Sequence, residues 1–377
     1  MYKKLSHFFW FIIKPYRWHV AGVYATAFLN AVSLSASPYL LKIIIDAVST
    51  NTGTKLEIFK TLTWPVLGYL LAHVLTACNY RFNDWLILKL FPNCKQGIIT
   101  HMYAYLNKHS YQYFQNSFAG SLLNKILDMV GSFPPVLRKL DLFFGLFCLV
   151  LIANFILFQV HPIFAMILFT WTLAFLGLSA SFTKKIKALS HDFSSLKTKT
   201  SGYIVDSISN MLNVRLFASE RFESERIGAA LLDTVQADRS LQRAILKMRI
   251  LQDLGIIGLM AAMLYGLLYF YGLGKITAGD FALVLSISAT VFQWVWYLAS
   301  EFVFFAEDLG KCAQALSIIS APHAIRDREP PKLLEIKSGK IEFKDLKFGY
   351  ESKGPLFEKF NVILKAGEKT GLVGSFW

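Results

Sequence analysis

Cysteine is scarce in this sequence, and its distribution excludes two common kinds of structured site. The four cysteines stand at positions 78, 94, 148 and 312, and no two of them form a CxxC pair. A disulfide framework or a zinc site needs cysteines at closer, repeated spacings. The histidines also show no ligand or general-base spacing. The sequence therefore predicts neither a metal site nor a catalytic residue.

Charged residues are also few, and this excludes an ordinary soluble enzyme. They make up 17% of the chain, whereas 54% is hydrophobic and the mean hydropathy is +0.44. This composition is typical of a protein embedded in lipid. The net charge is +14, but no arginine–glycine tract accompanies it, so nucleic acid is excluded as a partner. The charge instead predicts basic loops on the cytoplasmic side of a membrane.

The N-terminus lacks the features of a cleavable signal peptide. Its apolar run at residues 8–13 is cut short by Lys14, Pro15 and Arg17, and no small-residue cleavage site follows. We expect residues 1–17 to form an amphipathic segment that lies on the cytoplasmic surface of the membrane before the first span.

Six apolar stretches are long enough to cross a bilayer, which takes about 20 helical residues. The first, third and fifth intervals between them are short, whereas the second and fourth run to about 45 and 65 residues, beyond an ordinary loop. The long intervals lack the glycine, serine and proline bias of linkers, so we expect helices that continue out of the membrane. The six stretches are residues 18–46, 61–90, 137–160, 162–182, 251–273 and 279–305.

The distribution of lysine and arginine predicts the orientation of these spans. The N-terminal segment and the two long intervals are rich in both, whereas the three short intervals hold only Lys55, Lys60 and Lys275. Because cytoplasmic loops are enriched in positive charge, we expect both termini and both long intervals to be cytoplasmic. The prediction is a multi-pass protein of a bacterial inner membrane.

The composition changes after the sixth stretch. The chain becomes polar and proline-bearing, as in a linker, and then shows two alternating strands and a third, continuously apolar strand at residues 370–373. The first strand shifts its alternation between Phe343 and Phe348, which predicts a β-bulge. We therefore divide the chain into a surface segment 1–17, a membrane domain 18–320, a linker 321–339 and a truncated soluble domain 340–377.

Together with the six spans, the motifs IEFKDLKFGY at residues 341–350 and GEKTGLVG at residues 367–374 make the sequence resemble an ABC exporter half-transporter. The segments at residues 110–132 and 201–226 resemble the two intracellular loops of that family, and ITAGDF at residues 276–281 is typical before its last span. The resemblance implies an all-α membrane domain of about six helices with long cytoplasmic helical loops. A truncated, β-rich start of an ABC ATPase domain would follow.

The resemblance also implies ATP and Mg²⁺ as cofactors of the complete transporter. Tyr350 is implied to stack on adenine, although a strand-end tyrosine that fills a core edge is the alternative. Gly374 is implied to begin the phosphate-binding loop, whose lysine would fall after residue 377. We therefore treat Tyr350 and Gly374 as the remnant of an ATP site. We assign no catalytic residue and expect no productive ATP binding or hydrolysis by this chain alone.

The tips of the two long loops are implied to carry short helices that dock on a nucleotide-binding domain and pass its movement to the spans. An ordinary solvent-facing helix is the alternative for both tips. For the first tip, four neighbouring aromatic residues favour docking, because a solvated tip rarely exposes so many. The candidate coupling residues are Tyr113, Phe114 and Phe118 in the first tip and Asp206, Asn210 and Asn213 in the second.

Charges within or beside the spans are further candidates. Lys42 and Asp46 lie four residues apart on one helix face, so we expect them to pair. Arg81 and Asp84 lie three residues apart, and we expect a salt bridge or a place in a cavity wall. Glu301 is expected near the cytoplasmic side of the last span. The aromatic residues there fit either a substrate path or packing; they are Trp294, Trp296 and Tyr297.

The predicted function is that of the transmembrane subunit of an ATP-dependent exporter that moves an unidentified substrate. Its expected partners are the bilayer, a second identical or different transmembrane half, and a nucleotide-binding domain supplied elsewhere. One alternative is a non-functional, truncated product of a disrupted transporter gene, which the tail at residues 375–377 favours. The other is a channel or secondary transporter, but the internal repeats and broken helices that it requires are not evident.

Overall fold

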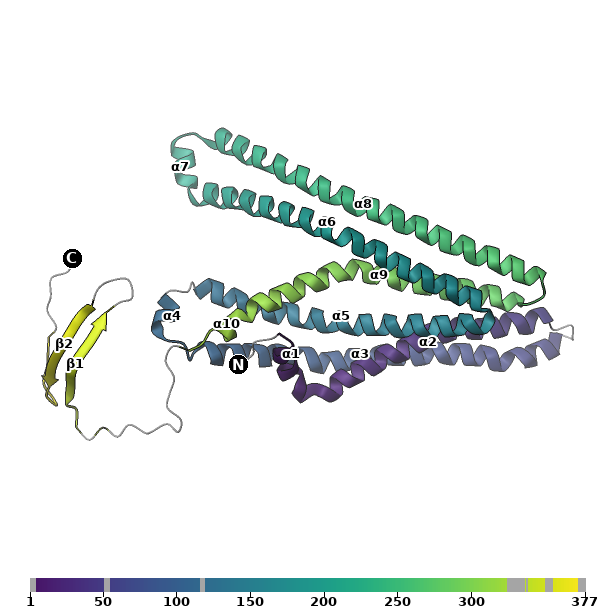
Figure 1. Cartoon of the computed structure of the whole chain (residues 1–377), viewed down its shortest axis with the longest axis horizontal. Coiled ribbons are helices and arrows are strands. Elements are labelled where there is room, and N and C mark those ends of the chain that lie inside the picture. The colour runs from purple at the N-terminus through teal and green to yellow at the C-terminus, as the bar shows by residue number, and fades with distance from the viewer. Residues whose placement is uncertain are drawn as a thin grey trace. The chain divides into compact units, whose positions relative to one another are not determined.

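The computed structural model describes residues 5–50, 55–115, 119–323, 336, 338–349 and 355–371, and Figure 1 shows the chain as a cartoon. The chain divides into two compact units, Met1–Pro322 and His323–Trp377, which are described separately. The helices of the first unit are α1 (Leu5–Ile13), η1 (Lys14–Tyr16), α2 (Arg17–Thr50), α3 (Lys55–Leu106), α4 (Tyr111–Gln115), α5 (Ala119–Val160), α6 (Pro162–Ser209), α7 (Met211–Leu216), α8 (Glu220–Gly272), α9 (Ala278–Ala315) and α10 (Ser317–Ser320).

Six helical segments in the described part of the chain are long and apolar enough to cross a membrane. Five of them contain the first five predicted spans to within one residue, in α2, α3, α5, α6 and α8, and the sixth, in α9, ends at residue 298 and so covers most of the predicted span 279–305. Helix is the expected form there, because each backbone N–H and C=O in lipid needs a partner within its own segment. The prediction of six spans is confirmed, and the chain is a multi-pass integral membrane protein.

The long intervals are helical, as the sequence predicts. Helices α3 and α5 extend into the second interval, and helices α6 and α8 extend into the fourth. None of the four is broken at the expected membrane boundary. Helix α3 has 52 residues and α8 has 53. At 1.5 Å per residue each is about 80 Å long, against a hydrocarbon core of about 30 Å. More than half of each helix therefore lies outside the lipid.

The spans form two groups within the first unit. Helices α6 and α8 pack along each other, and α2, α3, α5 and α9 contact one another in a second group. Figure 1 shows α6 and α8 side by side, diverging from α5 and α9 towards α7. The two groups meet through contacts of α6 with α5 and of α8 with α9.

Two main clusters of buried apolar side chains hold these helices together. One, around Leu168, Met263 and Leu283, joins α5, α6, α8 and α9. The other, around Met102 and Phe133, joins α3, α5 and α9, and it also receives α1. Helix α1 buries Phe8 and Ile12 in this second cluster and leaves Trp10 exposed. The placement of the N-terminal segment on the membrane surface stays a prediction.

The turn between α8 and α9 positions the first turn of α9, which makes polar contacts with α2. Helix α8 ends in a Schellman motif, in which Lys275 N donates to Phe270 O at 3.0 Å and Gly274 N donates to Tyr271 O at 2.9 Å. Gly274 adopts φ +68°, a left-handed conformation that glycine reaches without a Cβ clash. Helix α9 begins three residues later with Thr277 as its N-cap.

The second unit contains two antiparallel strands, β1 (Ile341–Gly349) and β2 (Pro355–Leu364). The register shifts between Phe343 and Leu346, where Asp345 has φ 47°, so the predicted bulge is confirmed. Asn361 of β2 stabilises it, because its amide oxygen accepts from Asp345 N and its amide nitrogen donates to the Asp345 carboxylate. Of the predicted third strand, the described residues Thr370 and Gly371 lie outside any strand, and residues 372–373 lie outside the described part.

Candidate functional site

A polar cavity of about 200 Å³ lies between α2, α3, α5 and α9. Helical periodicity places its residues on single faces, such as Thr26 and Asn30 on α2 and Asn79 and Asn83 on α3, each pair four residues apart. Polar residues on the apolar spans of a membrane protein are functional candidates by default. Its wall includes Thr26, Asn30, Leu34, Asn79, Asn83, Asp84, Arg138, Asp141, Leu146 and Trp294.

The side-chain amides of Asn79 and Asn83 are oriented by α2. Asn79 Nδ2 donates to the backbone oxygen of Thr26 at 3.0 Å, and Asn83 Nδ2 donates to Thr26 Oγ1 at 2.6 Å. Thr26 uses its own hydroxyl proton on Val23 O at 2.7 Å, so towards Asn83 it acts only as an acceptor. Each amide therefore donates one hydrogen bond to α2.

The Arg81–Asp84 pair forms as predicted, with Arg81 Nη1 3.0 Å from Asp84 Oδ2. Asp84 also lines the cavity, whereas Arg81 does not. Of the aromatic candidates in the last span, Trp294 lines the cavity and Trp296 and Tyr297 are exposed. Spacing alone would not distinguish these roles, because they depend on which neighbouring helix each face meets.

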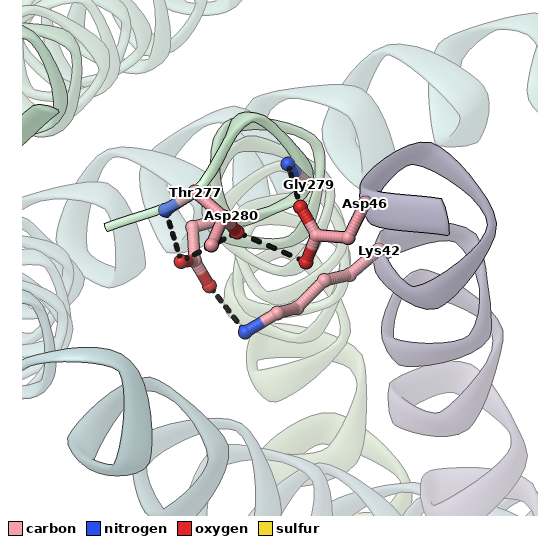
Figure 2. A network of polar contacts seen from close by, with 5 residues as sticks. All are labelled: Lys42, Asp46, Thr277, Gly279 and Asp280. Atoms are coloured by element: carbon pink, nitrogen blue, oxygen red, sulfur yellow. Dashed lines mark hydrogen bonds and ion pairs between the residues drawn. The ribbon is translucent and has the colours of Figure 1, made fainter. Parts of the chain in front are cut away.

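A network of polar contacts joins the end of α2 to the first turn of α9 (Figure 2). Lys42 Nζ lies 2.6 Å from Asp280 Oδ1. Asp46 accepts from Gly279 N at 2.7 Å and from Thr277 Oγ1 at 2.9 Å. Asp280 also accepts from Thr277 N at 2.8 Å, which completes a capping box. The network therefore satisfies N–H groups that the start of a helix leaves without intrahelical partners.

The predicted Lys42–Asp46 pair is wrong, and Figure 2 shows the reason. Each residue finds a partner across the helix interface in place of its neighbour four residues away. The Asp280 carboxylate is almost fully buried, so it needs a cation, while the N-terminus of α9 offers N–H donors and a positive dipole to Asp46. The sequence signal that was available is ITAGDF, whose Thr-x-x-Asp spacing is that of a capping box.

Gly279 is required by the close approach of α2 to α9. A Cβ at this position would lie 2.5 Å from Lys42 O and 2.6 Å from Asp46 Oδ1. Both distances are below any tolerable contact, and one of the two atoms is backbone. Glycine at this position therefore lets the two helices touch where the network forms.

A second buried charge cluster joins α5 and α9 and shares no residue with the Lys42 network. Lys139 is 8% exposed and its Nζ lies 2.8 Å from Asp308 Oδ2 and 3.8 Å from Glu301 Oε2. The ammonium also lies 5.5 Å from the ring centre of Phe304. Lys139 was recognised in the sequence only as a positive charge. Its partner is 169 residues away, and no local pattern marks such a pair.

The first predicted coupling tip contains the short helix α4. Tyr113 stacks on His109 with ring centres 4.0 Å apart and packs against the cluster around Met102. Phe114 is 38% exposed, and Tyr111 is 77% exposed. Tyr113 therefore helps to hold α4 on α3, while Tyr111 and Phe114 remain accessible. Phe118 lies outside the described residues.

The second predicted tip is the turn between α6 and α8, which carries α7. Asn210 Nδ2 donates to Asp206 O at 2.9 Å and to Asp206 Oδ1 at 3.1 Å. Arg226 of α8 lies 3.6 Å from the Asp206 carboxylate. Asn213 N donates to Asn210 O at 2.9 Å and so forms the first turn of α7. These three predicted residues therefore shape the tip from within.

The outer surface of α7 is apolar, which the sequence analysis did not single out. Leu212, Leu216 and Phe217 are each more than 70% exposed. The tip stands at the end of α6 and α8, far from the apolar spans, so these side chains face water unless a partner covers them. A cluster of this kind marks an interaction surface.

The chain leaves α7 through an unusual turn. Ser219 N donates to Val214 O at 2.9 Å and Ala218 N donates to Arg215 O at 3.2 Å, which is a Schellman motif. Its left-handed position is occupied by Ala218, with φ 48°. An alanine there carries strain that a glycine would not.

The predicted remnant of an ATP site cannot be located, because Tyr350 and Gly374 both lie outside the described residues. Within the described part of the chain, no group of three or more histidine, cysteine, aspartate or glutamate side chains is placed to hold a metal ion. Cys94, Cys148 and Cys312 are buried and unpaired. Burial is the main cause that raises the pKa of the Cys312 thiol to about 12, so this thiol stays protonated.

Comparison with known proteins gives a family match over most of the first unit. A family model described as the ABC transporter transmembrane region matches residues 21–295. An uncharacterized ABC transporter ATP-binding protein of Haemophilus influenzae is 24% identical over 273 residues, which cover 70% of this chain and 43% of that protein. An ATP-dependent lipid A-core flippase of Legionella pneumophila (strain Paris) is 22% identical over 394 residues, with coverage of 99% and 62%.

Solved structures show the same fold. A bacterial Atm1-family ABC exporter with ATP bound superposes with a TM-score of 0.71 over 93% of this chain and 62% of that chain, at 18% identity. The part of these three proteins that this chain matches is 43–62% of their length.

Proposed function

Because the chain belongs to the ABC transporter transmembrane region family, we propose that it forms one transmembrane half of an ATP-driven exporter. In this proposal a second half, identical or different, completes the pathway, and a substrate passes between the two halves. The observation that carries the proposal is the pair of tips, α4 and α7, on helices about 30–50 Å longer than the bilayer core requires. Such an extension fits the transfer of movement from a soluble motor to the spans.

We assign the docking contact of the second tip to Leu212, Leu216 and Phe217. Removing their exposed apolar surface from water is favourable, so a partner that covers these side chains would be held there by the hydrophobic effect. Asp206, Asn210 and Asn213 hold the backbone that presents them. At the first tip, Phe114 would make the contact, while Tyr113 anchors α4.

The proposed orientation places α1, α4 and α7 in the cytoplasm of a bacterium and the α8–α9 turn outside its inner membrane. The support is the lysine and arginine content of the segments on either side of the spans. In the same proposal residues 18–320 are the membrane domain, 321–339 the linker and 340–377 the start of a nucleotide-binding domain, which uses ATP and Mg²⁺.

Orientation can be tested by cysteine labelling in intact cells. In a variant without native cysteines, Lys275→Cys should react with a membrane-impermeant maleimide from outside, and Glu220→Cys at the second tip should react only after the cells are opened. Both positions are exposed. The reverse pattern would contradict the proposed orientation.

Coupling can be tested with a spin label at Leu216→Cys in membranes of the native host, where the partners of the chain are present. We expect Mg-ATP with vanadate to change the distance between labels on the two halves. The change should be lost when Leu212→Asp is added, because a carboxylate would break the apolar contact. A distance between labels on the two halves that stays the same with and without Mg-ATP and vanadate would overturn the exporter proposal.

A further inference from the structure

We propose that the cavity between α2, α3, α5 and α9 is a binding site for a small organic ammonium ion. Two oxygen atoms on its wall residues carry the inference, Asn30 Oδ1 and Asp141 Oδ1. Both are buried and have no hydrogen-bond partner within the described part of the chain. Buried polar atoms are nearly always satisfied, so acceptors left open at a cavity indicate that something with hydrogen-bond donors occupies it.

The amides of Asn79 and Asn83 add further polar groups to the wall. Each donates one N–H to Thr26, and the direction of both bonds is fixed because Thr26 offers them only acceptors. Each amide therefore keeps its carbonyl oxygen and one N–H for a ligand. An anionic ligand brings only acceptors, so it would leave Asn30 Oδ1 and Asp141 Oδ1 without a donor.

One carboxylate oxygen of the wall lacks a donor. Asp84 and Asp141 line the cavity together with one arginine, Arg138, and Asp84 has its partner in Arg81, which does not line the cavity. Arg138 lies one helical turn from Asp141 on α5, yet Asp141 Oδ1 has no hydrogen-bond partner within the described part of the chain. This oxygen is therefore the acceptor that remains for a ligand. A protonated amine supplies both a charge and up to three N–H donors to Asp141 and Asn30.

The size and apolar part of the cavity restrict the ligand further. Its volume is about 200 Å³, and Leu34, Leu146 and Trp294 contribute apolar surface. This space fits an amine with one aromatic ring system, such as an indole or a phenyl group, or a short alkyl body. Trp294 adds a π surface, which attracts cations and stacks on aromatic rings.

The binding site stands on its own geometry. The statement that its ligand is the transported substrate rests on the proposed function, because only an exporter would carry that ligand across the membrane. A binding measurement therefore tests the site without the motor. Loss of ATP coupling would contradict the proposed function and leave the binding site unaffected.

The experiment measures equilibrium binding of tritiated tryptamine to the full chain in lipid nanodiscs. Two analogues isolate the features of the ligand: the trimethylated ammonium keeps the charge and lacks the ammonium N–H donors, and tryptophol replaces the amine by a neutral hydroxyl. Because hydrogen bonds to charged groups are strong, we expect both to bind at least about tenfold more weakly than tryptamine.

Two variants link binding to the named residues. Asp141→Asn preserves shape and should weaken tryptamine binding about tenfold or more, whereas Asn30→Asp adds a carboxylate and should strengthen it. A gain of affinity cannot come from misfolding, so the second variant decides the question even if the first is unstable. Asp128→Asn, an exposed carboxylate on the same helix outside the cavity, is the matched control and should leave binding unchanged.

Several results would overturn the proposal. Equal binding of tryptophol and tryptamine would show that charge is not recognised. Tighter binding of indole-3-acetate would indicate an anion site at Arg138. Failure of tryptamine and of the smaller phenethylamine to bind, or binding that ignores both Asp141→Asn and Asn30→Asp, would remove the site.

Discussion

Lys42 Nζ lies 2.6 Å from the Asp280 carboxylate, although 238 positions separate the two residues in the sequence. The pair joins the far end of the first span to the first turn of the last one. It is supported by Asp46, which accepts hydrogen bonds from the same turn of α9. These contacts therefore hold the first span and the last span of the chain together.

The first prediction concerns the glycine beneath this network. Gly279→Ala should lower the free energy of unfolding by about 1–3 kcal/mol, because an added Cβ would meet the Lys42 carbonyl and push α9 away from α2. Thermal unfolding in nanodiscs measures the effect. Gly258→Ala, where a Cβ meets nothing within 4 Å, is the control and should not lower the melting temperature. Equal melting temperatures for the two variants would show that the close approach is not needed.

The second prediction concerns the buried Lys139. Lys139→Met should destabilise the protein by about 3–5 kcal/mol, because the Asp308 and Glu301 carboxylates would remain close together without their cation. Lys311→Met removes a similar contact with Glu307 at an exposed position and should cost no more than about 1 kcal/mol. Chemical unfolding monitored by tryptophan fluorescence gives both values. The idea fails if the two substitutions cost the same.

The third prediction concerns thiol reactivity. A thiol reacts as the thiolate, and with a pKa of about 12 Cys312 has only about one part in ten thousand in that form at pH 8. In a variant that keeps this single cysteine, labelling by N-ethylmaleimide should be very slow at pH 8 and accelerate as the pH rises. Gln314→Cys, at an exposed position two residues on, should label rapidly. Rapid labelling of Cys312 in the folded protein at pH 8 would disprove the burial of this side chain.

The fourth prediction concerns the turn after α7. Ala218→Gly should stabilise the tip by about 1 kcal/mol, because alanine pays a steric cost at φ 48° that glycine does not. Hydrogen exchange of residues 211–217 should slow down accordingly. Ala229→Gly, an exposed position inside α8, should have the opposite effect, since glycine weakens a helix interior. Faster exchange in Ala218→Gly would contradict the strained turn.

The spans and their extensions were predictable because they depend on local properties. Hydropathy over about 20 residues marks a span, and a long interval without linker composition marks a helical extension. The β-bulge near Asp345 was predictable for the same reason, since a slip of alternation is visible within one strand. The membership of the ABC transporter family was predictable from the resemblance, to which ITAGDF and the two loop segments contributed.

The partners of the buried charges were not predictable from the sequence. Lys42 has a suitable neighbour in Asp46, yet each residue bonds to α9 instead, because the demand of a buried carboxylate and of open helix N–H groups exceeds that of an exposed i,i+4 pair. Lys139 and Asp308 are brought together only when α5 packs on α9. The cavity is lined by residues of four helices, so no single segment of the sequence could predict it.

The unbroken length of α8 also sets a mechanical scale. A straight helix about 80 Å long acts as a lever, and a rotation of about 5° around one end displaces the other by about 7 Å. Because α6 lies along α8 for much of its length, the two would bend less than either alone. A small tilt at the α7 tip would therefore reach the α8–α9 turn as a shift of several ångströms, which is enough to pull Thr277 and Gly279 away from Asp46.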